Sequence, residues 1–252
     1  MERIANICII LEKILDKIVA VILILLILFS GYSLWSSYKI YTGAFLGSDL
    51  LQFKPKEISE EGKNPTLDEL LRINKDIIGW ITIDDTHIDY PIVQGESNME
   101  YVNKDVYGKF SLSGSVFLDY KNNKDFTDPY NLLYAHHMDN GAMFGDVVNF
   151  EEKDYFDKHK TGTLYLPDKT YKIDIFMTLK ADAYDSIIFN PHGNESAKEV
   201  IEYADKLKLQ KSKIDIEDKN IIALSTCEKA TTNGRTIILG KLTQIETKKQ
   251  GT

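Results

Sequence analysis

An unbroken apolar run near the N-terminus constrains this chain more than any other sequence feature. Residues 18–29 read IVAVILILLILF, and residues that a membrane tolerates extend the segment to Trp35. The 18 residues from 18 to 35 would span about 27 Å as a helix, enough to cross the hydrocarbon core of a bilayer. We therefore predict a single membrane-spanning helix over residues 18–35.

A cleaved secretory signal is the competing interpretation, because the strictly apolar core is only 12 residues long. No clear Ala-x-Ala-type cleavage site follows the core, and Trp35, Tyr38 and Tyr41 are typical of residues that anchor a helix at a membrane interface. We therefore favour an anchor. Both interpretations predict that the rest of the chain is exported.

The charges beside the run favour an N-terminus on the inside of the cell. Arg3, Lys13 and Lys17 precede the run, and the positive-inside rule counts basic residues while largely ignoring acidic ones. We predict a cytoplasmic segment over residues 1–17 and a C-terminal domain on the extracellular face of the membrane. The net charge of −8 does not suit a nucleic acid partner.

Export makes the cysteine count informative. Cys8 precedes the apolar run, so Cys227 is the only cysteine expected outside the cell and has no disulfide partner. Such a cysteine is either a buried small hydrophobe or a reactive thiol, and the residues alone leave both open. Because the sequence has no CxxC or HExxH motif, we expect neither a metal nor another cofactor.

The exported part divides at Pro65. We predict a juxtamembrane helix and charged linker over residues 36–64, a folded domain over 65–245 and a flexible tail over 246–252. A Thr and a Glu with capping-box spacing predict a short helix just after Pro65. Further short helices are expected within residues 142–159.

Strand patterns dominate the folded domain. The clearest is Tyr171–Leu179, where apolar residues occupy every second position, a pattern that predicts one buried and one exposed face. An amphipathic pattern over residues 195–209, with a second capping-box spacing at Ser196, predicts a helix packed on the sheet. We predict a mainly β domain of about eight strands, over residues 79–83, 87–94, 115–119, 130–136, 161–166, 171–179, 221–224 and 236–242.

Three residue types at predicted strand ends could build a reactive site. A cysteine nucleophile needs a base, and His136 and His137 end an apolar strand just before a Gly-containing loop. Neighbouring strand residues point to opposite faces, so only one histidine should face Cys227, and the spacing does not decide which. Arg235 could stabilise an oxyanion or grip a peptide carbonyl, although an edge-strand arginine is the plainer interpretation.

Several ordered motifs lie between about Leu67 and Leu242. They are NKDIIGW at 74–80, DYPIVQ at 89–94, GSVFLD at 114–119, YAHHM at 134–138 followed by AMFG, and LSTCE at 224–228 with an arginine eight places beyond the cysteine. Together these motifs resemble those of class B sortases, the membrane-anchored cysteine transpeptidases of Gram-positive bacteria.

The resemblance implies an eight-stranded sortase-type β-barrel with N-terminal helices and a peripheral helix before the cysteine strand. It also implies roles for six residues: Cys227 as nucleophile, His136 as acid and base, Arg235 as stabiliser of the acyl intermediate, and Ser225, Glu228 and Asn98 as contacts of the sorting peptide. Ala135 and Ala223 stand where glycine and threonine are common in the family, which affects local packing more than chemistry.

The implied reaction cleaves a C-terminal sorting signal after its threonine through a thioacyl enzyme. An amine of cell-wall peptidoglycan or its precursor then takes the acyl group. The implied partners are surface proteins that bear the signal, the peptidoglycan amine, and the membrane through the N-terminal helix. An exported cysteine endopeptidase that uses water, and a non-catalytic domain that binds wall peptides, are the alternative functions.

Overall fold

The computed structural model describes residues 2–45, 48–55, 65–193, 196–215, 220–227 and 233–245. The chain forms two compact units, Met1–Thr42 and Gly43–Thr252.

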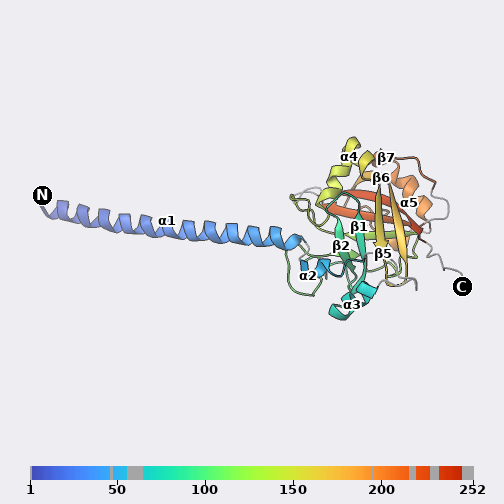
Figure 1. Ribbon diagram of the computed structural model, residues 1–252. Helices are drawn as coiled ribbons and strands as arrows, with labels where there is room; N and C mark the ends of the chain where they lie inside the picture. The colour runs from blue at the N-terminus through green and yellow to red at the C-terminus, as the bar shows by residue number, and fades with distance from the viewer. Residues whose placement is uncertain are drawn as a thin grey trace. The chain divides into compact units, whose positions relative to one another are not determined.

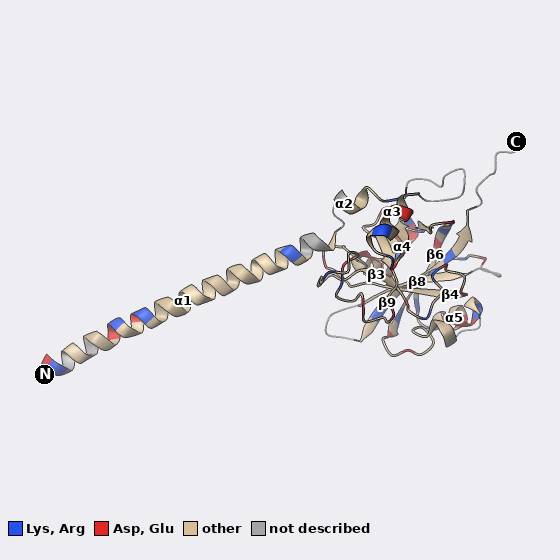
Figure 2. Ribbon diagram, turned by 90° about the horizontal axis from the view of Figure 1, so that it is seen from below, with Lys and Arg blue, Asp and Glu red and all other residues tan. Residues whose placement is uncertain are grey.

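The first unit is built from helix α1 (Glu2–Ala44), which continues well beyond the predicted span. Within Ile9–Ile40, an 18-residue window has a mean hydropathy of 2.5, and none of that window is buried inside the protein. No charged residue lies between Lys17 and Lys39, and the middle of α1 is accordingly tan in Figure 2. By length and composition α1 could cross a membrane, although a signal sequence would pass the same test.

The second unit is mainly β (Figure 1). Its helical elements are α2 (Ser48–Leu51), α3 (Pro65–Ile73), η1 (Gly145–Glu151), α4 (Lys153–Lys158), η2 (Pro191–Gly193) and α5 (Ala197–Ala204). Its strands are β1 (Ile77–Ile83), β2 (Asp89–Val93), β3 (Val116–Leu118), β4 (Tyr130–Tyr134), β5 (Thr161–Tyr165), β6 (Thr170–Asp182), β7 (Lys208–Lys211), β8 (Ile221–Cys227) and β9 (Gly234–Gln244).

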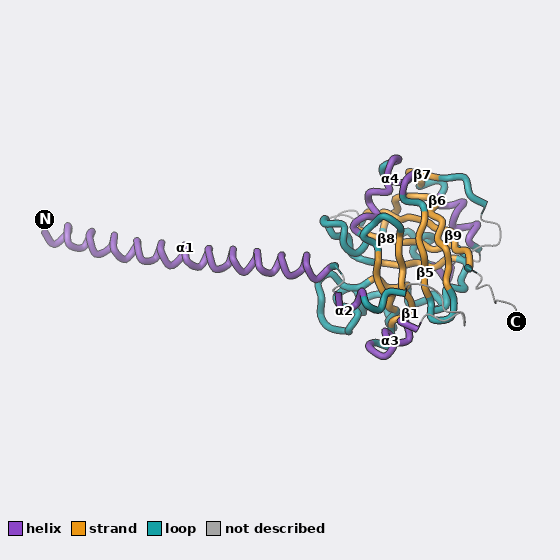
Figure 3. Tube along the Cα trace, viewed as in Figure 1, coloured by secondary structure: helices purple, strands orange, loops and turns teal. Residues whose placement is uncertain are grey.

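Eight of these strands close into a barrel, which confirms the predicted fold. The strand order is β5-β1-β2-β3-β4-β8-β9-β6-β7, and β5 also pairs with β6. This last pairing closes the ring and leaves β7 attached outside it. The strands form the centre of the unit in Figure 3, with the short helices at its periphery.

The barrel is buried on its inside and over part of its outside. All eight barrel strands contribute to the inner apolar cluster, which includes Ile81, Ile92, Leu133, Ile173 and Ile222. A second cluster lies on the outer face of β4, β6, β8 and β9, where α5 covers it through Val200 and Ala204. Burial on both faces explains why β4 and β8 read as nearly continuous apolar runs.

The alternation predicted for Tyr171–Leu179 holds only for its first half. Ile173 and Ile175 belong to the inner cluster, but a β-bulge between Ile175 and Met177 shifts the register against β9. Met177 and Leu179 consequently join the outer cluster beneath α5. The prediction of one buried face over the whole strand is therefore wrong beyond Ile175, because an extra residue in a strand exchanges its two faces.

The helix predicted over residues 195–209 is shorter than expected. Ser196 caps it as predicted, since its side chain accepts a hydrogen bond from the Glu199 backbone N–H. The helix α5 ends at Ala204, and Lys208–Lys211 form β7 instead, paired with β6. The prediction failed at this end because tertiary pairing with an exposed strand edge outweighs helix propensity.

Residues before Pro65 also contribute to the second unit. Ala44 and Leu50 are buried in it, and Lys54 forms an ion pair of 2.6 Å with Asp89 on β2. The core of this unit therefore begins within the segment that the sequence assigns to a juxtamembrane helix and linker.

Candidate active site

Three adjacent strands of the barrel, β4, β8 and β9, carry the predicted catalytic residues at or just beyond their ends. Parallel pairing of β4 with β8 places Tyr134 opposite Ser225, and antiparallel pairing of β8 with β9 places Cys227 opposite Arg235. His136 follows Tyr134 by two residues, as Cys227 follows Ser225. A hydrogen bond from the Ala135 N–H to the Ser225 carbonyl (3.3 Å) belongs to this last pair of β4 and β8. Cys227 and Arg235 are therefore a backbone pair, His136 lies two residues beyond the last paired residue of β4, and we call these three positions the row.

Two contacts hold His136 at the end of β4. Its carbonyl accepts a hydrogen bond of 3.1 Å from the Phe144 N–H, and its ring atom Nε2 lies 2.8 Å from the carbonyl oxygen of Val102. The first contact fixes the backbone, and the second fixes the ring of this half-buried side chain.

His137 has different surroundings. Its backbone pairs with Met143 in an isolated bridge, and its ring atom Nε2 lies 3.3 Å from Oδ1 of the exposed Asp139. Its Nδ1 is buried without a hydrogen-bond partner among the described residues. The two histidines that the sequence could not distinguish thus have separate contacts.

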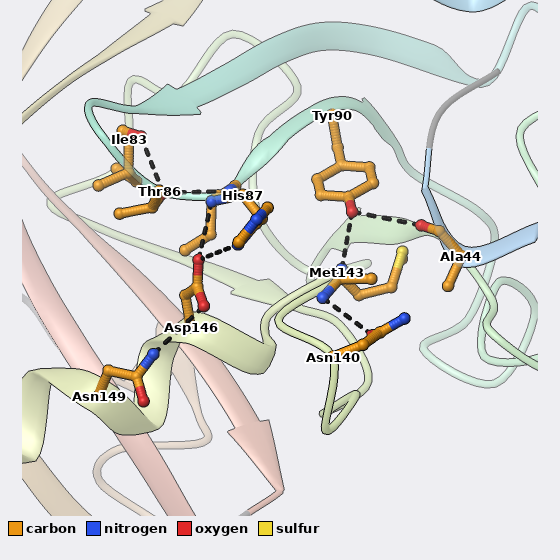
Figure 4. A network of polar contacts seen from close by, with 11 residues as sticks. Ala44, Ile83, Thr86, His87, Tyr90, Asn140, Met143, Asp146 and Asn149 are labelled. Atoms are coloured by element: carbon orange, nitrogen blue, oxygen red, sulfur yellow. Dashed lines mark hydrogen bonds and ion pairs between the residues drawn. The ribbon is translucent and has the colours of Figure 1, made fainter. Parts of the chain in front are cut away.

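The loop that follows the histidines is tied to β2 (Figure 4). The Tyr90 hydroxyl accepts a hydrogen bond from the Met143 N–H (2.8 Å) and donates one to the Ala44 carbonyl (3.2 Å). Burial raises the pKa of Tyr90 to about 12, so the hydroxyl remains protonated and can both donate and accept. Asp146 further along the loop accepts a hydrogen bond from the His87 backbone N–H (2.8 Å) and lies 2.9 Å from His87 Nδ1. These contacts anchor the loop that supports His136.

Arg235 is half-buried at the start of β9, and its guanidinium donates to the adjacent Gly234 carbonyl at 3.1 Å. No carboxylate within the described ranges pairs with it. Burial, reinforced by the charge of Asp119, raises the pKa of Tyr134 well above its ordinary value, while the positive charge of Arg235 opposes this rise. Arg235 therefore presents a positive charge near the ends of β4 and β8.

Of the three residues predicted to contact the sorting peptide, the structure describes Ser225 and Asn98. The Ser225 hydroxyl is buried and has no hydrogen-bond partner among the described residues. Asn98 donates to Asp119 Oδ2 (2.7 Å) and accepts from the Tyr120 N–H (2.9 Å). Glu228 and the side chain of Cys227 lie outside the part of the chain that the structure describes.

Asp119 is a site residue to which the sequence analysis assigned no role. This buried carboxylate accepts from the Asn98 amide, from the Tyr134 hydroxyl at 3.0 Å and from the Lys121 N–H at 3.0 Å. The sequence did contain a feature that could have pointed to Asp119, because it is a charged residue at the end of an apolar strand within one of the quoted motifs. The cluster joins Asn98 to β4 and so to the row of candidate residues.

The row combines the components of acyl transfer. It contains a cysteine position, an imidazole and a guanidinium, which can act as nucleophile, acid and base, and oxyanion stabiliser. Among the described residues, no group of three or more His, Cys, Asp or Glu side chains could hold a metal ion.

Comparison with known proteins supports this chemistry. A family model described as "Sortase domain" matches residues 81–243. The chain is 35% identical over 182 residues to a protein named "Sortase B" of Listeria monocytogenes, covering 70% of this chain and 73% of the relative.

Solved structures of class B sortases are also similar to this chain. A Streptococcus pyogenes class B sortase described as involved in pilus biogenesis is 46% identical, with a TM-score of 0.65, and the match covers 70% of this chain and 97% of that one. A Staphylococcus aureus sortase B–substrate complex is 27% identical, with a TM-score of 0.68, over 74% of this chain and 88% of that one.

Proposed function

This chain belongs to the sortase family and is a cysteine transpeptidase similar to class B sortases, and from this premise we propose that Cys227, His136 and Arg235 carry its reaction. Cys227 is the nucleophile, His136 the general acid and base, and Arg235 the group that stabilises the acyl intermediate. The strand register supports these roles most directly, because it pairs Cys227 with Arg235 and ends on β4 at Tyr134, two residues before His136.

The reaction has two halves. In the first, the Cys227 thiolate attacks the carbonyl carbon after the threonine of a sorting signal, and the amide C–N bond breaks. His136 protonates the leaving amine, and a thioacyl enzyme remains. In the second half an amine attacks the thioester, His136 takes the proton of the attacking amine, and the thiolate leaves. Arg235 stabilises the oxyanion that forms in each half.

Three further residues contact the sorting peptide in this proposal: Ser225, Glu228 and Asn98. The Ser225 hydroxyl, which has no partner within the described ranges, supports this role, because a buried hydroxyl without a partner is costly until a ligand supplies one. In the described part of the chain, Asn98 has one amide N–H beyond its contacts with Asp119 and Tyr120.

Two solved relatives support the nature of the substrates. One is a sortase B–substrate complex, and another is a sortase B complexed with triglycine, a short peptide that ends in an amine. Sorting-signal peptides and amine acceptors are therefore the substrate classes. The finer assignment that we propose is a surface protein as acyl donor and an amine of peptidoglycan or its precursor as acceptor.

The proposed location rests on the length and composition of α1. We assign residues 18–35 to a membrane anchor, with residues 1–17 inside the cell and the catalytic domain over 65–245 on the extracellular face. The segment 36–64 connects the two, and 246–252 is a tail. The uncharged stretch between Lys17 and Lys39 supports the membrane span, since its length suits a bilayer, and the basic residues before it support an N-terminus inside the cell.

A ligation assay tests the proposal. Intact cells that display the full chain receive a sorting-signal peptide and a labelled amine that does not cross membranes. We expect a peptide–amine product, and we expect none when Cys227→Ala replaces the chain. Hydrolysis without ligation would identify a cysteine endopeptidase, and full activity of Cys227→Ala would make the thiol structural. Product formed only after the cells are opened would reverse the proposed orientation.

A further inference from the structure

The contact between His136 and Val102 determines which ring nitrogen carries hydrogen. The Val102 oxygen lies 2.8 Å from Nε2 of His136. A carbonyl oxygen can only accept a hydrogen bond, so Nε2 must be protonated. A neutral imidazole has one N–H, and its other nitrogen, Nδ1, is then bare.

The segment that carries this carbonyl is held in place from two sides. The Tyr101 carbonyl accepts a hydrogen bond of 3.1 Å from the Ser115 N–H. The Tyr101 hydroxyl donates to Asp76 (2.9 Å) and accepts from the Asn74 amide (2.9 Å) at the junction of α3 and β1. Burial raises the pKa of Tyr101 to about 12, which keeps the hydroxyl protonated. The residue before Val102 is therefore fixed on the barrel.

Gly114 permits the close approach of this segment. Its φ of +61° is in the left-handed region, and a Cβ at this position would lie 2.3 Å from the Val102 oxygen and 2.9 Å from the Tyr101 oxygen. Gly108 in the same connection between β2 and β3 has a similar φ of +76°, but a Cβ there would meet nothing within 4 Å. Any side chain at position 114 would consequently displace the carbonyl that faces His136.

We propose that the Val102 carbonyl is a positioning group that holds His136 in the Nε2–H tautomer, so that Nδ1 is the atom that gives and receives the proton. This inference rests on the proposed function and specifies its acid and base. In the first half-reaction Nδ1–H of the imidazolium protonates the leaving amine. In the second, Nδ1 takes the proton of the attacking amine as the C–S bond breaks and the Cys227 thiolate leaves. Nε2 remains bonded to Val102 throughout, so the ring does not turn between the two halves.

Nitrogen NMR tests the tautomer without any activity measurement. The full chain, in detergent micelles, is labelled with ¹⁵N in its five histidines, and His136→Gln identifies the signals of His136 by their loss. We expect a protonated Nε2 and a bare Nδ1 in the neutral ring. A predominant Nδ1–H form would overturn the inference. If the expected tautomer is found but His136→Gln still forms product, the assignment of His136 in the proposed function fails instead.

A matched pair of glycine variants tests the role of the carbonyl. Gly114→Ala and Gly108→Ala both place alanine at a positive φ, but only the first displaces Val102. We expect Gly114→Ala to lower kcat by about 10²-fold and to mix the two tautomers, while Gly108→Ala stays within about twofold of the parent. Equal losses, or an unchanged His136 spectrum in a folded Gly114→Ala, would contradict the proposal. If Gly114→Ala does not fold, the spectrum of the unaltered chain decides.

Discussion

His136 and His137 are adjacent in the chain, but their side chains have different chemical environments. The His136 ring bonds a backbone carbonyl that has no charge, whereas the His137 ring lies beside the exposed carboxylate of Asp139. His137 also has a buried Nδ1 with no partner among the described residues. At the residue scale, the first arrangement suits a proton carrier and the second suits a residue that supports the local packing.

We predict that His136→Ala abolishes acyl-enzyme formation and that His137→Ala only weakens it. Removing His136 removes the proton donor for the leaving amine, an effect of about 10²–10⁴-fold. Removing the His137 side chain loses its contact with Asp139 but leaves the backbone bridge to Met143 and the Val102 contact in place. Mass spectrometry of the enzyme after mixing with a sorting peptide measures the acyl adduct directly. The reverse order of effects would transfer the acid–base role to His137.

Residue types and motifs alone could predict only part of this site. Cys227, His136 and Arg235 could be proposed because their side chains carry suitable chemistry within quoted motifs, and the family resemblance chose His136 over His137. The Val102 carbonyl was not, since every residue has such a group and only the fold determines where it points. Asp119 is an intermediate case, because its charge at a strand end was visible but its partners Asn98 and Tyr134 come together only in the barrel.

At the scale of elements, β6 and α5 show what a pattern can predict. The apolar residues of β6 were recognised correctly as buried, but the bulge that moves Met177 to the outer face left no mark in the sequence. The start of α5 was predicted from its Ser196 cap, a local interaction. Its end depends on β7 pairing with β6, which is a tertiary interaction. In these two elements, the helix start that depends on a local interaction was predicted correctly, whereas the helix end and the bulge, which depend on distant segments, were not.

We predict that Ser196→Ala lowers the free energy of unfolding by about 1 kcal/mol, the usual cost of losing an N-cap. The Ser196 hydroxyl accepts from the Glu199 N–H at 3.4 Å, and this bond is lost in the variant. Ser186→Ala is the control, because Ser186 is exposed and caps no helix. Urea titration of both variants measures the difference, and equal stabilities would show that the cap contributes nothing.

At the scale of the whole molecule, the barrel buries several tyrosines whose hydroxyls must stay neutral. Burial raises the pKa of Tyr90 to about 12, and it raises the pKa values of Tyr130 and Tyr134 above their ordinary range. A folded pKa above the unfolded value of 10.0 means that folding favours the protonated form. The stabilisation is therefore complete below pH 10 and is lost as the pH rises through the folded pKa.

We predict steep alkaline unfolding above pH 10. Each such tyrosine lowers the free energy of unfolding by about 1.4 kcal/mol per pH unit between its unfolded and folded pKa values. Tyr90→Phe should remove about one such contribution from the slope between pH 10 and 12, whereas Tyr184→Phe, at a residue that is 82% exposed, should leave the slope unchanged. Urea titrations at a series of pH values measure it. An identical slope in Tyr90→Phe and the parent would contradict the prediction.

The barrel as a whole was predictable as a class but not as a topology from strand patterns. The eight strands were recognisable from their apolar residues, and the resemblance to a family implied that they close into a barrel. Their order, with β4 beside β8 and β5 beside β6, depends on pairings between segments far apart in sequence. No local pattern of residues encodes which strand edges meet.

The parallel pairing of β4 with β8 also determines when the protein can become active. Asn131 on β4 bonds the Ile221 carbonyl on β8 across 90 positions of the chain. Synthesis proceeds from the N-terminus, so His136 is made long before Cys227 and Arg235 exist. Pairings of such long separation form slowly, because the intervening chain must close first. An unfinished or truncated chain therefore holds no assembled site, and transpeptidation must wait for the last strand to join the barrel.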